Sequence, residues 1–207
     1  LGRMYLNAGR YAQAQEVLDE VLQLYPRFSL TLREPPGPQW SLIDRGQVAR
    51  LQGEAELAVA CFDESIRLFT ASPFPHLAIF PLQFRGEVRC EEDDLSAALV
   101  DFRRCLRLAV EDPNSWDTEM IKCLTGIAEV AYRCGTATVA GKLYAKAAVM
   151  EAQWRAAGRH SQPHVMAFYQ RVMAAVPDYC TDPAFDTAWQ EGAALTLEDA
   201  VQLALAW

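Results

Sequence analysis

Apolar residues along this chain follow a helical spacing, and no stretch shows the sustained alternation of apolar and polar residues that a half-buried strand needs. Glycines, prolines and one acidic run interrupt the pattern. The pattern predicts four antiparallel pairs of helices, over residues 1–9, 11–25, 40–52, 54–69, 76–90, 94–111, 115–134 and 136–157. The expected fold class is therefore all-α.

Prolines limit two of the predicted segments. Residues 32–39 read LREPPGPQ, and three prolines in so short a stretch exclude a regular helix. Pro81 falls inside the helix predicted over 76–90, so we expect that helix to be kinked or shortened.

Three more helices are predicted in residues 158–207. Ser161 with Pro163 begins one that ends at about residue 175, and Asp182-Pro183 begins another that ends at about 191. Thr196, followed three residues later by Asp199, is a helix-start signal, because its hydroxyl can accept a hydrogen bond from a free backbone N–H. A last helix is expected from about residue 197.

The helical pairs repeat. A small residue and a bulky residue four positions later recur together with steps of 44, 40 and 42 residues, and turn residues follow the same order. The small residues are Ala14, Ala58, Ala98 and Ala140, the bulky ones are Leu18, Phe62, Phe102 and Tyr144, and the turns are Gly9, Gly53, the acidic run 91–94 and Gly135.

The opening LGRMYLNAGRYAQAQEVLDEVLQLYP resembles a tetratricopeptide repeat (TPR) that lacks the first six positions of its first helix. Small residues let paired helices touch, large ones fill the gap, and Gly turns the corner. The sequence thus predicts an α-α superhelix: four TPR-like helix pairs over 1–157, the first truncated, and a C-terminal helical cap over 158–207, in one continuous domain. The first residue, Leu1, lies within a helical pattern, which suggests a piece of a larger polypeptide.

The end of the chain carries a narrower pattern. It has the form aromatic-x-x-Ala-Trp-x-x-Gly-x-x-x-Ser/Thr-Leu-Glu-x-Ala, occupied by Phe185, Ala188, Trp189, Gly192, Thr196, Leu197, Glu198 and Ala200. With residues 127–176, it resembles the C-terminal region of bacterial STAND-type signal-transduction ATPases, the group of LuxR-family transcriptional regulators and predicted ATPases. A usual Leu-Gly-Ala-Ala stretch is replaced here by residues 143–148.

The resemblance implies a regulatory superhelix whose ATPase domain lies upstream in the same polypeptide. It also implies that the last helices cover the open apolar end of the superhelix, since terminal repeats need a closing face. Trp189 is expected to be a buried anchor of that cap.

The TPR register implies a concave binding groove lined by the first helix of each pair. Carried over by matched columns, the groove positions are Arg3, Asn7, Trp40, Gln47, Arg50, Gln83, Glu87, Glu91, Glu129, Tyr132 and Arg133. Arg50 and Arg133 are expected to face solvent. A protein or peptide partner, or a small effector, would bind there, although this polar and aromatic mixture also suits a hydrated helix face.

Net charge limits the partners. The chain has 19 basic and 27 acidic residues, a net charge of −8, so we expect no direct nucleic-acid binding and no membrane binding. Six cysteines without CxxC spacing predict neither a zinc site nor a disulfide scaffold, which is typical of a reduced, cytoplasmic protein.

Catalytic and metal signals are weak. His160 and His164 have helical metal-pair spacing but flank Pro163, and residues 91–94 are better interpreted as a solvated turn than as a cation site. No glycine pattern forms a phosphate loop. We therefore expect no enzyme activity, no cofactor and no metal in this segment.

Two functions remain open. One is the regulatory or sensor superhelix of a signal-transduction ATPase that acts as a transcriptional regulator. The alternative is a free-standing TPR adaptor that scaffolds protein–protein interactions.

Overall fold

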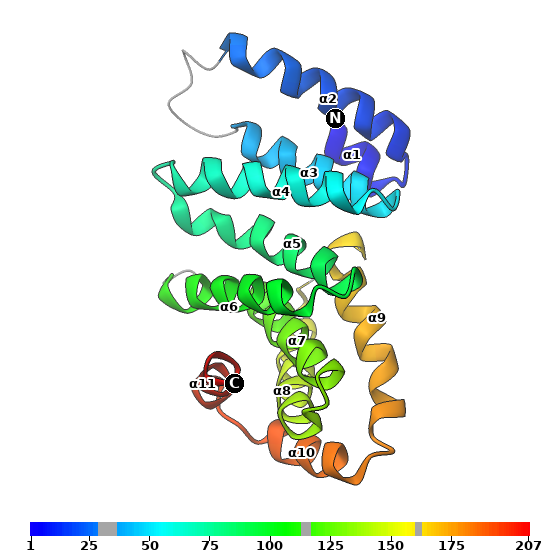
Figure 1. Ribbon diagram of the computed structural model, residues 1–207, viewed down its shortest axis with the longest axis vertical. Coiled ribbons are helices and arrows are strands. Elements are labelled where there is room, and N and C mark those ends of the chain that lie inside the picture. Colours follow the sequence, from blue (N-terminus) through cyan, green and yellow to red (C-terminus); the bar gives the residue numbers. More distant parts are fainter. Residues whose placement is uncertain (29–36, 113–116, 160–162) are drawn as a thin grey trace.

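The computed structural model describes residues 1–28, 37–112, 117–159 and 163–207, and all regular structure in these ranges is helical (Figure 1). The predicted all-α fold class is confirmed. The helices are α1 (Gly2–Asn7), α2 (Tyr11–Phe28), α3 (Pro38–Leu51), α4 (Ala55–Thr70), the 3₁₀ turn η1 (Pro75–Ala78), α5 (Ile79–Glu91), α6 (Leu95–Glu111), α7 (Asp117–Arg133), α8 (Ala137–Ala156), α9 (Pro163–Tyr179), α10 (Pro183–Ala193) and α11 (Leu197–Ala206).

Prolines set several of these boundaries. Helix α3 begins at Pro38, two residues before the predicted start, because proline is tolerated at the first helical position. The helix predicted from residue 76 begins instead at Ile79, after the turn η1, and Pro81 lies in its first turn. Helix α9 continues past the predicted end at 175 and includes Pro177. The other prolines of the segment 32–39 lie outside the described residues.

The same turn closes the first helix of all four pairs. A residue with positive φ ends the helix: Gly9 (φ 70°), Gly53 (80°), Asp93 (66°) and Gly135 (79°). In each case the next backbone N–H donates to the carbonyl five residues back, at 2.8–2.9 Å. The predicted turn positions are therefore confirmed, and Asp93 is the one non-glycine residue among them.

A second repeated column holds the pairs together. A Cβ added to Gly46 would lie 2.6 Å from the ring of Phe62, and one added to Gly86 would lie 2.9 Å from the ring of Phe102. Both rings are fully buried. The glycine of the first helix thus makes room for the bulky residue sixteen positions later, and this spacing recurs at Gly2 with Leu18.

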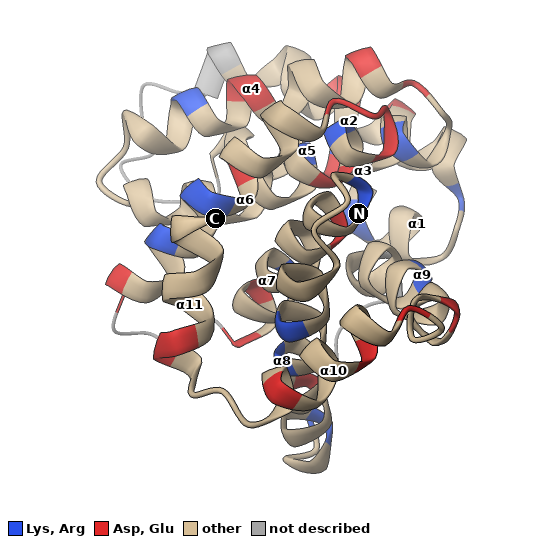
Figure 2. Cartoon of the chain, turned by 60° about the horizontal axis from the view of Figure 1, so that its bottom comes forward, with Lys and Arg blue, Asp and Glu red and all other residues tan. Residues whose placement is uncertain are grey.

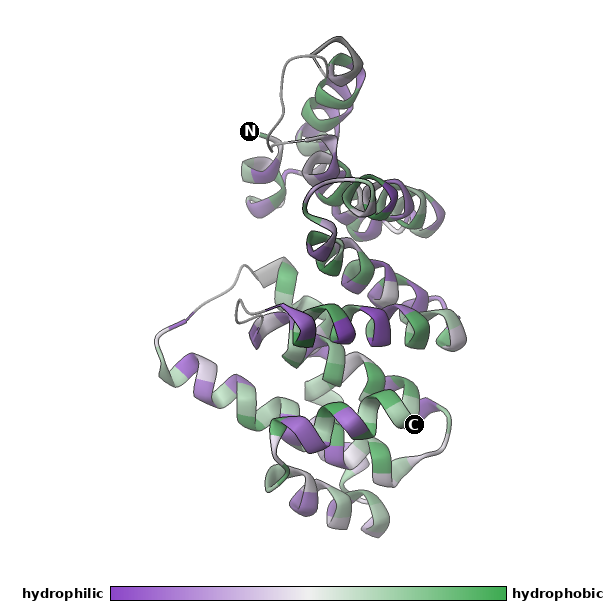
Figure 3. Ribbon diagram, turned by 90° about the vertical axis from the view of Figure 1, so that its left-hand side faces the viewer, coloured by the Kyte–Doolittle hydropathy of each residue, from purple (hydrophilic) through white to green (hydrophobic). Residues whose placement is uncertain are grey.

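The pairs stack into a superhelix with two layers. The first helices α1, α3, α5 and α7 contact one another in order, and each second helix packs against the first helix of the next pair. Figure 1 shows α2 to α6 stacked along the long axis. Hydrophobic and hydrophilic residues alternate around the helices (Figure 3), as expected for helices with one buried face.

The last three helices have different positions. Helix α10 packs closely against α8, and α11 packs against α6, α7 and α8. Helix α9 instead contacts α7 and runs beside the first-helix layer (Figure 1). Within residues 158–207, for which we predicted a cap, α10 and α11 thus pack against α6 to α8, while α9 lies along the concave side.

Trp189 is not the buried anchor that we predicted. Its ring is only half-buried and stacks on Phe185, with 6.3 Å between the ring centroids. Phe185 is completely buried and also contacts Tyr132, Tyr144 and Tyr179. The aromatic residue at the start of the C-terminal pattern is therefore the anchor of α10.

Charges are dispersed over the surface. Figure 2 shows acidic and basic residues interspersed on the helices, without a face of one sign in that view. In the described part of the chain, no helix combines the length and the apolarity that a membrane crossing requires.

Candidate functional site

A cavity of about 600 Å³ opens on the concave side, between the first helices and α9. Four helices build it, so each contributes one face to a shared space. The lining residues are Gln47, Arg50 and Leu51 of α3, Cys90 and Glu91 of α5, Glu129 and Arg133 of α7, and Ala167, Phe168, Arg171 and Val172 of α9. We call this space the concave cavity.

Arg50 is the centre of an ion-pair network in the concave cavity. Its guanidinium donates to both carboxylate oxygens of Glu91, at 2.9 and 2.6 Å, and to Glu87. Burial lowers the pKa of Arg50, but the charges of Glu87 and Glu91 outweigh this and raise its pKa above the ordinary value. The side chain is only 10% exposed, so the expectation that Arg50 faces solvent is wrong.

Glu91 connects this network to α9. Burial raises the pKa of its carboxyl, whereas hydrogen bonds from Arg50 and Arg171 lower it, and the net shift is downward. Arg171 donates to Glu91 at 2.8 Å from a side chain that is 58% exposed. Residues 91–94 are all exposed, as expected for a solvated turn, and Glu91 in addition pairs with the mostly buried Arg50.

Helix α7, the first helix of the fourth pair, forms another wall of the concave cavity. Arg133 donates to the Cys90 carbonyl and, at 2.6 Å, to Asp93, and its side chain is 31% exposed. Glu129 accepts a hydrogen bond from the Tyr144 hydroxyl. Burial, with the nearby charge of Glu129, raises the pKa of the Cys90 thiol to about 11, so this thiol is protonated at neutral pH and is a poor nucleophile.

A second cavity, of about 280 Å³, lies closer to the N-terminus. Trp40 forms part of it and packs against Phe69 and Phe80, with ring centroids 5.3 and 5.2 Å apart. Arg3 and Asn7 of α1 also line it, and Arg3 pairs with Asp44 at 2.9 Å. Burial is the main cause of the raised pKa of Asp44, and Arg3 partly opposes it. We call this space the aromatic cavity.

The predicted groove residues separate into two groups. Most line one of the two cavities: Arg3, Asn7 and Trp40 the aromatic cavity, Arg50, Glu91, Glu129 and Arg133 the concave cavity, and Gln47 both. Of the others, Gln83 and Glu87 lie beneath the surface, at 0% and 1% exposure, and the half-buried Tyr132 stacks on Tyr179 at 3.7 Å. The repeat register thus predicts residues that line the two cavities, but it does not distinguish accessible positions from covered ones.

The contribution of α9 was missed at the sequence level. Its apolar positions Met166, Tyr169, Val172 and Val176 are spaced three and four apart and are all buried. That spacing is visible in the sequence and indicates a helix that needs an apolar partner surface. It does not say which surface, and the concave side is the one used.

The two cavities are lined by groups that can donate and accept hydrogen bonds. Within the described ranges, no three His, Cys, Asp or Glu residues form a cluster that could hold a metal ion. His160 lies outside those ranges, as does the side chain of His164. The TPR-type helical repeat is an architecture that generally binds partners.

Comparison with known proteins supports the repeat at one end. Residues 1–28, which form α1 and α2, match the family model of the tetratricopeptide repeat. No curated protein sequence and no solved structure gave a match. The first helical pair is therefore similar to a TPR, and the later pairs share its turns and its packing columns.

Proposed function

We propose that this chain is a protein-interaction scaffold that holds a peptide segment of a partner protein in the concave cavity. The observation that carries this proposal is the cavity itself, built jointly by α3, α5, α7 and α9. Its volume of about 600 Å³ lies within the range of ligand sites, which is about 300–1,000 Å³.

The residues that line the concave cavity favour a peptide over a ligand that carries charge of only one sign. Arginines and glutamates of the concave cavity are paired with each other or with neighbours, so the site presents donors and acceptors side by side. Leu51 and Ala167, both exposed, add apolar surface. A peptide carries backbone donors, backbone acceptors and apolar side chains along one strand, and so can use all of these groups.

An exposed alanine on α9 allows a direct test. Ala167 lines the concave cavity, so Ala167→Trp should fill it without disturbing the buried face of α9. Peptides selected against the wild-type protein from a random library should bind this variant at least about tenfold more weakly. Their affinities are measured by calorimetry, and melting temperature checks the fold.

The matched control is Ala174→Trp, on the same helix but outside the lining of the concave cavity. It should bind the selected peptides as the wild type does. If Ala167→Trp also keeps full affinity, or if no peptide can be selected, the concave cavity is not a peptide site.

The C-terminal pattern favours a second, finer proposal: this scaffold is the sensor region of a STAND-type ATPase that regulates transcription in the cytoplasm. Phe185, Ala188 and Gly192 are buried where α10 meets α8, and Thr196 caps α11 by accepting from the Asp199 N–H. In this proposal, residues 1–157 are the sensing repeats and 158–207 close them. The full reading frame tests it, because an upstream phosphate-binding loop supports it and a short frame without one contradicts it.

A further inference from the structure

Lys122 of α7 is a buried ammonium for which the described residues supply no hydrogen-bond acceptor. Its side chain is 1% exposed, and the nearest carboxylate oxygen, of Glu119, lies 3.6 Å from Nζ, which is ion-pair contact but longer than a hydrogen bond. Because burying a charge is costly unless it is paired and hydrogen-bonded, this ammonium is incompletely satisfied by the described part of the chain.

Lys122 lines the aromatic cavity together with a second buried polar side chain, that of Gln47. Gln47 is 3% exposed, and no residue in the described ranges hydrogen-bonds with its side-chain amide. Its NH₂ group can donate two hydrogen bonds, and its carbonyl oxygen can accept. Two buried polar side chains from different helices, α3 and α7, therefore border one space with donors that the described residues leave unused.

Aromatic rings form much of the rest of the aromatic cavity, beside the polar residues of α1, α3 and α7. Trp40, Phe80, Phe84 and Trp154 line it, and Val165 of α9 completes one side. Apolar walls with a few polar groups are typical of small-molecule sites, and a volume of about 280 Å³ lies near the lower limit of such sites.

The charges around the cavity indicate the sign of the ligand. Asp44 is occupied by Arg3 at 2.9 Å, and Glu119 is the only carboxylate that pairs with Lys122 in the described part of the chain. The Lys122 ammonium already lies 5.4 Å from the centroid of the Phe84 ring, so a second cation against that ring would meet like charge. Lys122 can only donate, and the Gln47 amide can donate as well as accept, so an acceptor oxygen on a ligand can satisfy both side chains.

We propose that the aromatic cavity binds a small aromatic carboxylate. The ring lies among the tryptophans and phenylalanines, and the carboxylate accepts hydrogen bonds from Lys122 Nζ and the Gln47 amide. This site is separate from the peptide site, because only Gln47 lines both cavities. Either a simple aromatic acid or an aromatic amino acid carries this chemistry.

The test is a titration of the whole chain with phenylacetate, followed by ligand-observed NMR. Phenylacetate should bind, and its neutral analogue phenylacetamide should bind more weakly. Phenethylamine has the same ring with a cation in place of the anion and should not compete. If phenylalanine binds more tightly than phenylacetate, the source is an amino acid; if it binds more weakly, the source is a simple acid.

Substitutions in the aromatic cavity test whether phenylacetate binds there. The double variant Lys122→Met with Glu119→Gln removes both charges and should weaken phenylacetate binding about tenfold or more, since hydrogen bonds to charged groups are among the strongest. Its matched control is Lys142→Met with Glu191→Gln, which removes another lysine–glutamate pair (2.8 Å) that lies between α8 and α10. The control should bind normally.

A third variant, Val165→Trp, fills the cavity and should abolish binding even if the charge variant folds poorly, because Val165 is only half-buried. Melting temperature is recorded for every variant. The proposal is overturned if phenylacetate fails to bind the wild type, if phenethylamine binds more tightly than phenylacetate, or if a folded Val165→Trp variant binds phenylacetate as well as the wild type.

Discussion

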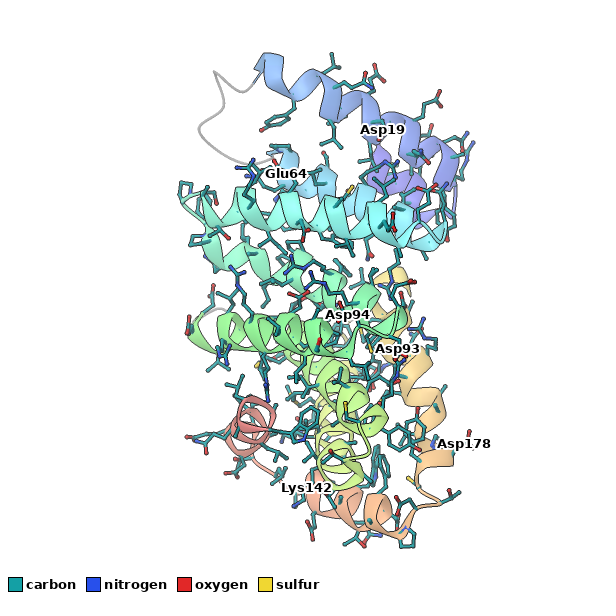
Figure 4. All side chains as sticks on the ribbon, viewed as in Figure 1. Asp19, Glu64, Asp93, Asp94, Lys142 and Asp178 are labelled. Atoms are coloured by element: carbon teal, nitrogen blue, oxygen red, sulfur yellow. The ribbon has the colours of Figure 1, made fainter. Side chains whose placement is uncertain are left out.

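Asp93 and Asp94, labelled in Figure 4, are neighbours in the turn between α5 and α6 but have different backbone conformations. Asp93 has φ of 66°, the left-handed region that favours glycine, whereas Asp94 is the N-cap of α6 and accepts from the Ala97 N–H at 3.2 Å. The other three pairs have glycine where this one has Asp93. Substitutions at the two positions should therefore change stability in opposite directions.

We expect Asp93→Gly to raise the free energy of unfolding by about 0.5–1 kcal/mol, because it removes backbone strain. The lost pair with Arg133 contributes little, since the Asp93 side chain is 76% exposed. Asp94→Ala should lower the free energy of unfolding by about 1 kcal/mol through loss of the cap. Urea unfolding measures both, and an equal loss of stability in the two variants would show that this turn is wrongly described.

The arginines of the concave cavity should also differ in how much each contributes to stability. Arg50→Ala should cost about 3–5 kcal/mol, because it leaves Glu87, which is 1% exposed, without its cationic partner. Arg171→Ala should cost no more than about 1 kcal/mol, since its side chain is 58% exposed. Thermal unfolding compares them, and a small effect of Arg50→Ala would mean that the network is not buried in solution.

Which individual side chains are buried was the feature least predictable from the sequence. The sequence places Arg50 and Glu87 correctly on the inner face of their helices. Their mutual pairing depends on how close α3 and α5 approach, and these residues are 37 positions apart. Lys122 was missed for the same reason, because a lone lysine in a helix is usually exposed.

At the scale of elements, two glycines set the contact between α8 and α10. A Cβ on Gly192 would lie 2.3 Å from the Lys142 carbonyl oxygen, and one on Gly141 would lie 2.7 Å from the Phe185 carbonyl oxygen. Both contacting atoms belong to the backbone, so neither can move away by a change of side-chain rotamer. The two helices can approach this closely only without these side chains.

Gly192→Ala should therefore move α10 away from α8 and cost about 1–3 kcal/mol, the usual range for overpacking. Alanine normally favours a helix over glycine, so a purely local effect would have the opposite sign. Ala193→Ser, at the exposed neighbouring position, serves as the control and should change stability by less than about 0.5 kcal/mol. An increase in melting temperature for Gly192→Ala would contradict the close packing.

Element boundaries followed from local chemistry and were largely predictable. Gly9, Gly53 and Gly135 end helices because glycine adopts positive φ without strain, and Thr196 begins one because its hydroxyl caps. The position of α9 was not predictable in this way. Its apolar stripe requires a partner, but several surfaces of a superhelix could provide one.

At the scale of the whole molecule, α9 covers part of the inner face of the superhelix. The concave cavity and the aromatic cavity both include α9 residues, Arg171 in the first and Val165 in the second. The outer side has a groove of its own, of about 500 Å³, between α4 and the end of α5. The central question is therefore which of the two sides binds the partner.

Photo-crosslinking from two exposed alanines answers this most directly. A photoreactive amino acid at position 167 lies in the concave cavity, and the same amino acid at position 60 lies in the outer groove. With a peptide selected for binding to the wild type, we predict crosslinks from position 167 and none above background from position 60. Crosslinks from position 60 without any from position 167 would contradict the peptide-site proposal and assign binding to the outer face.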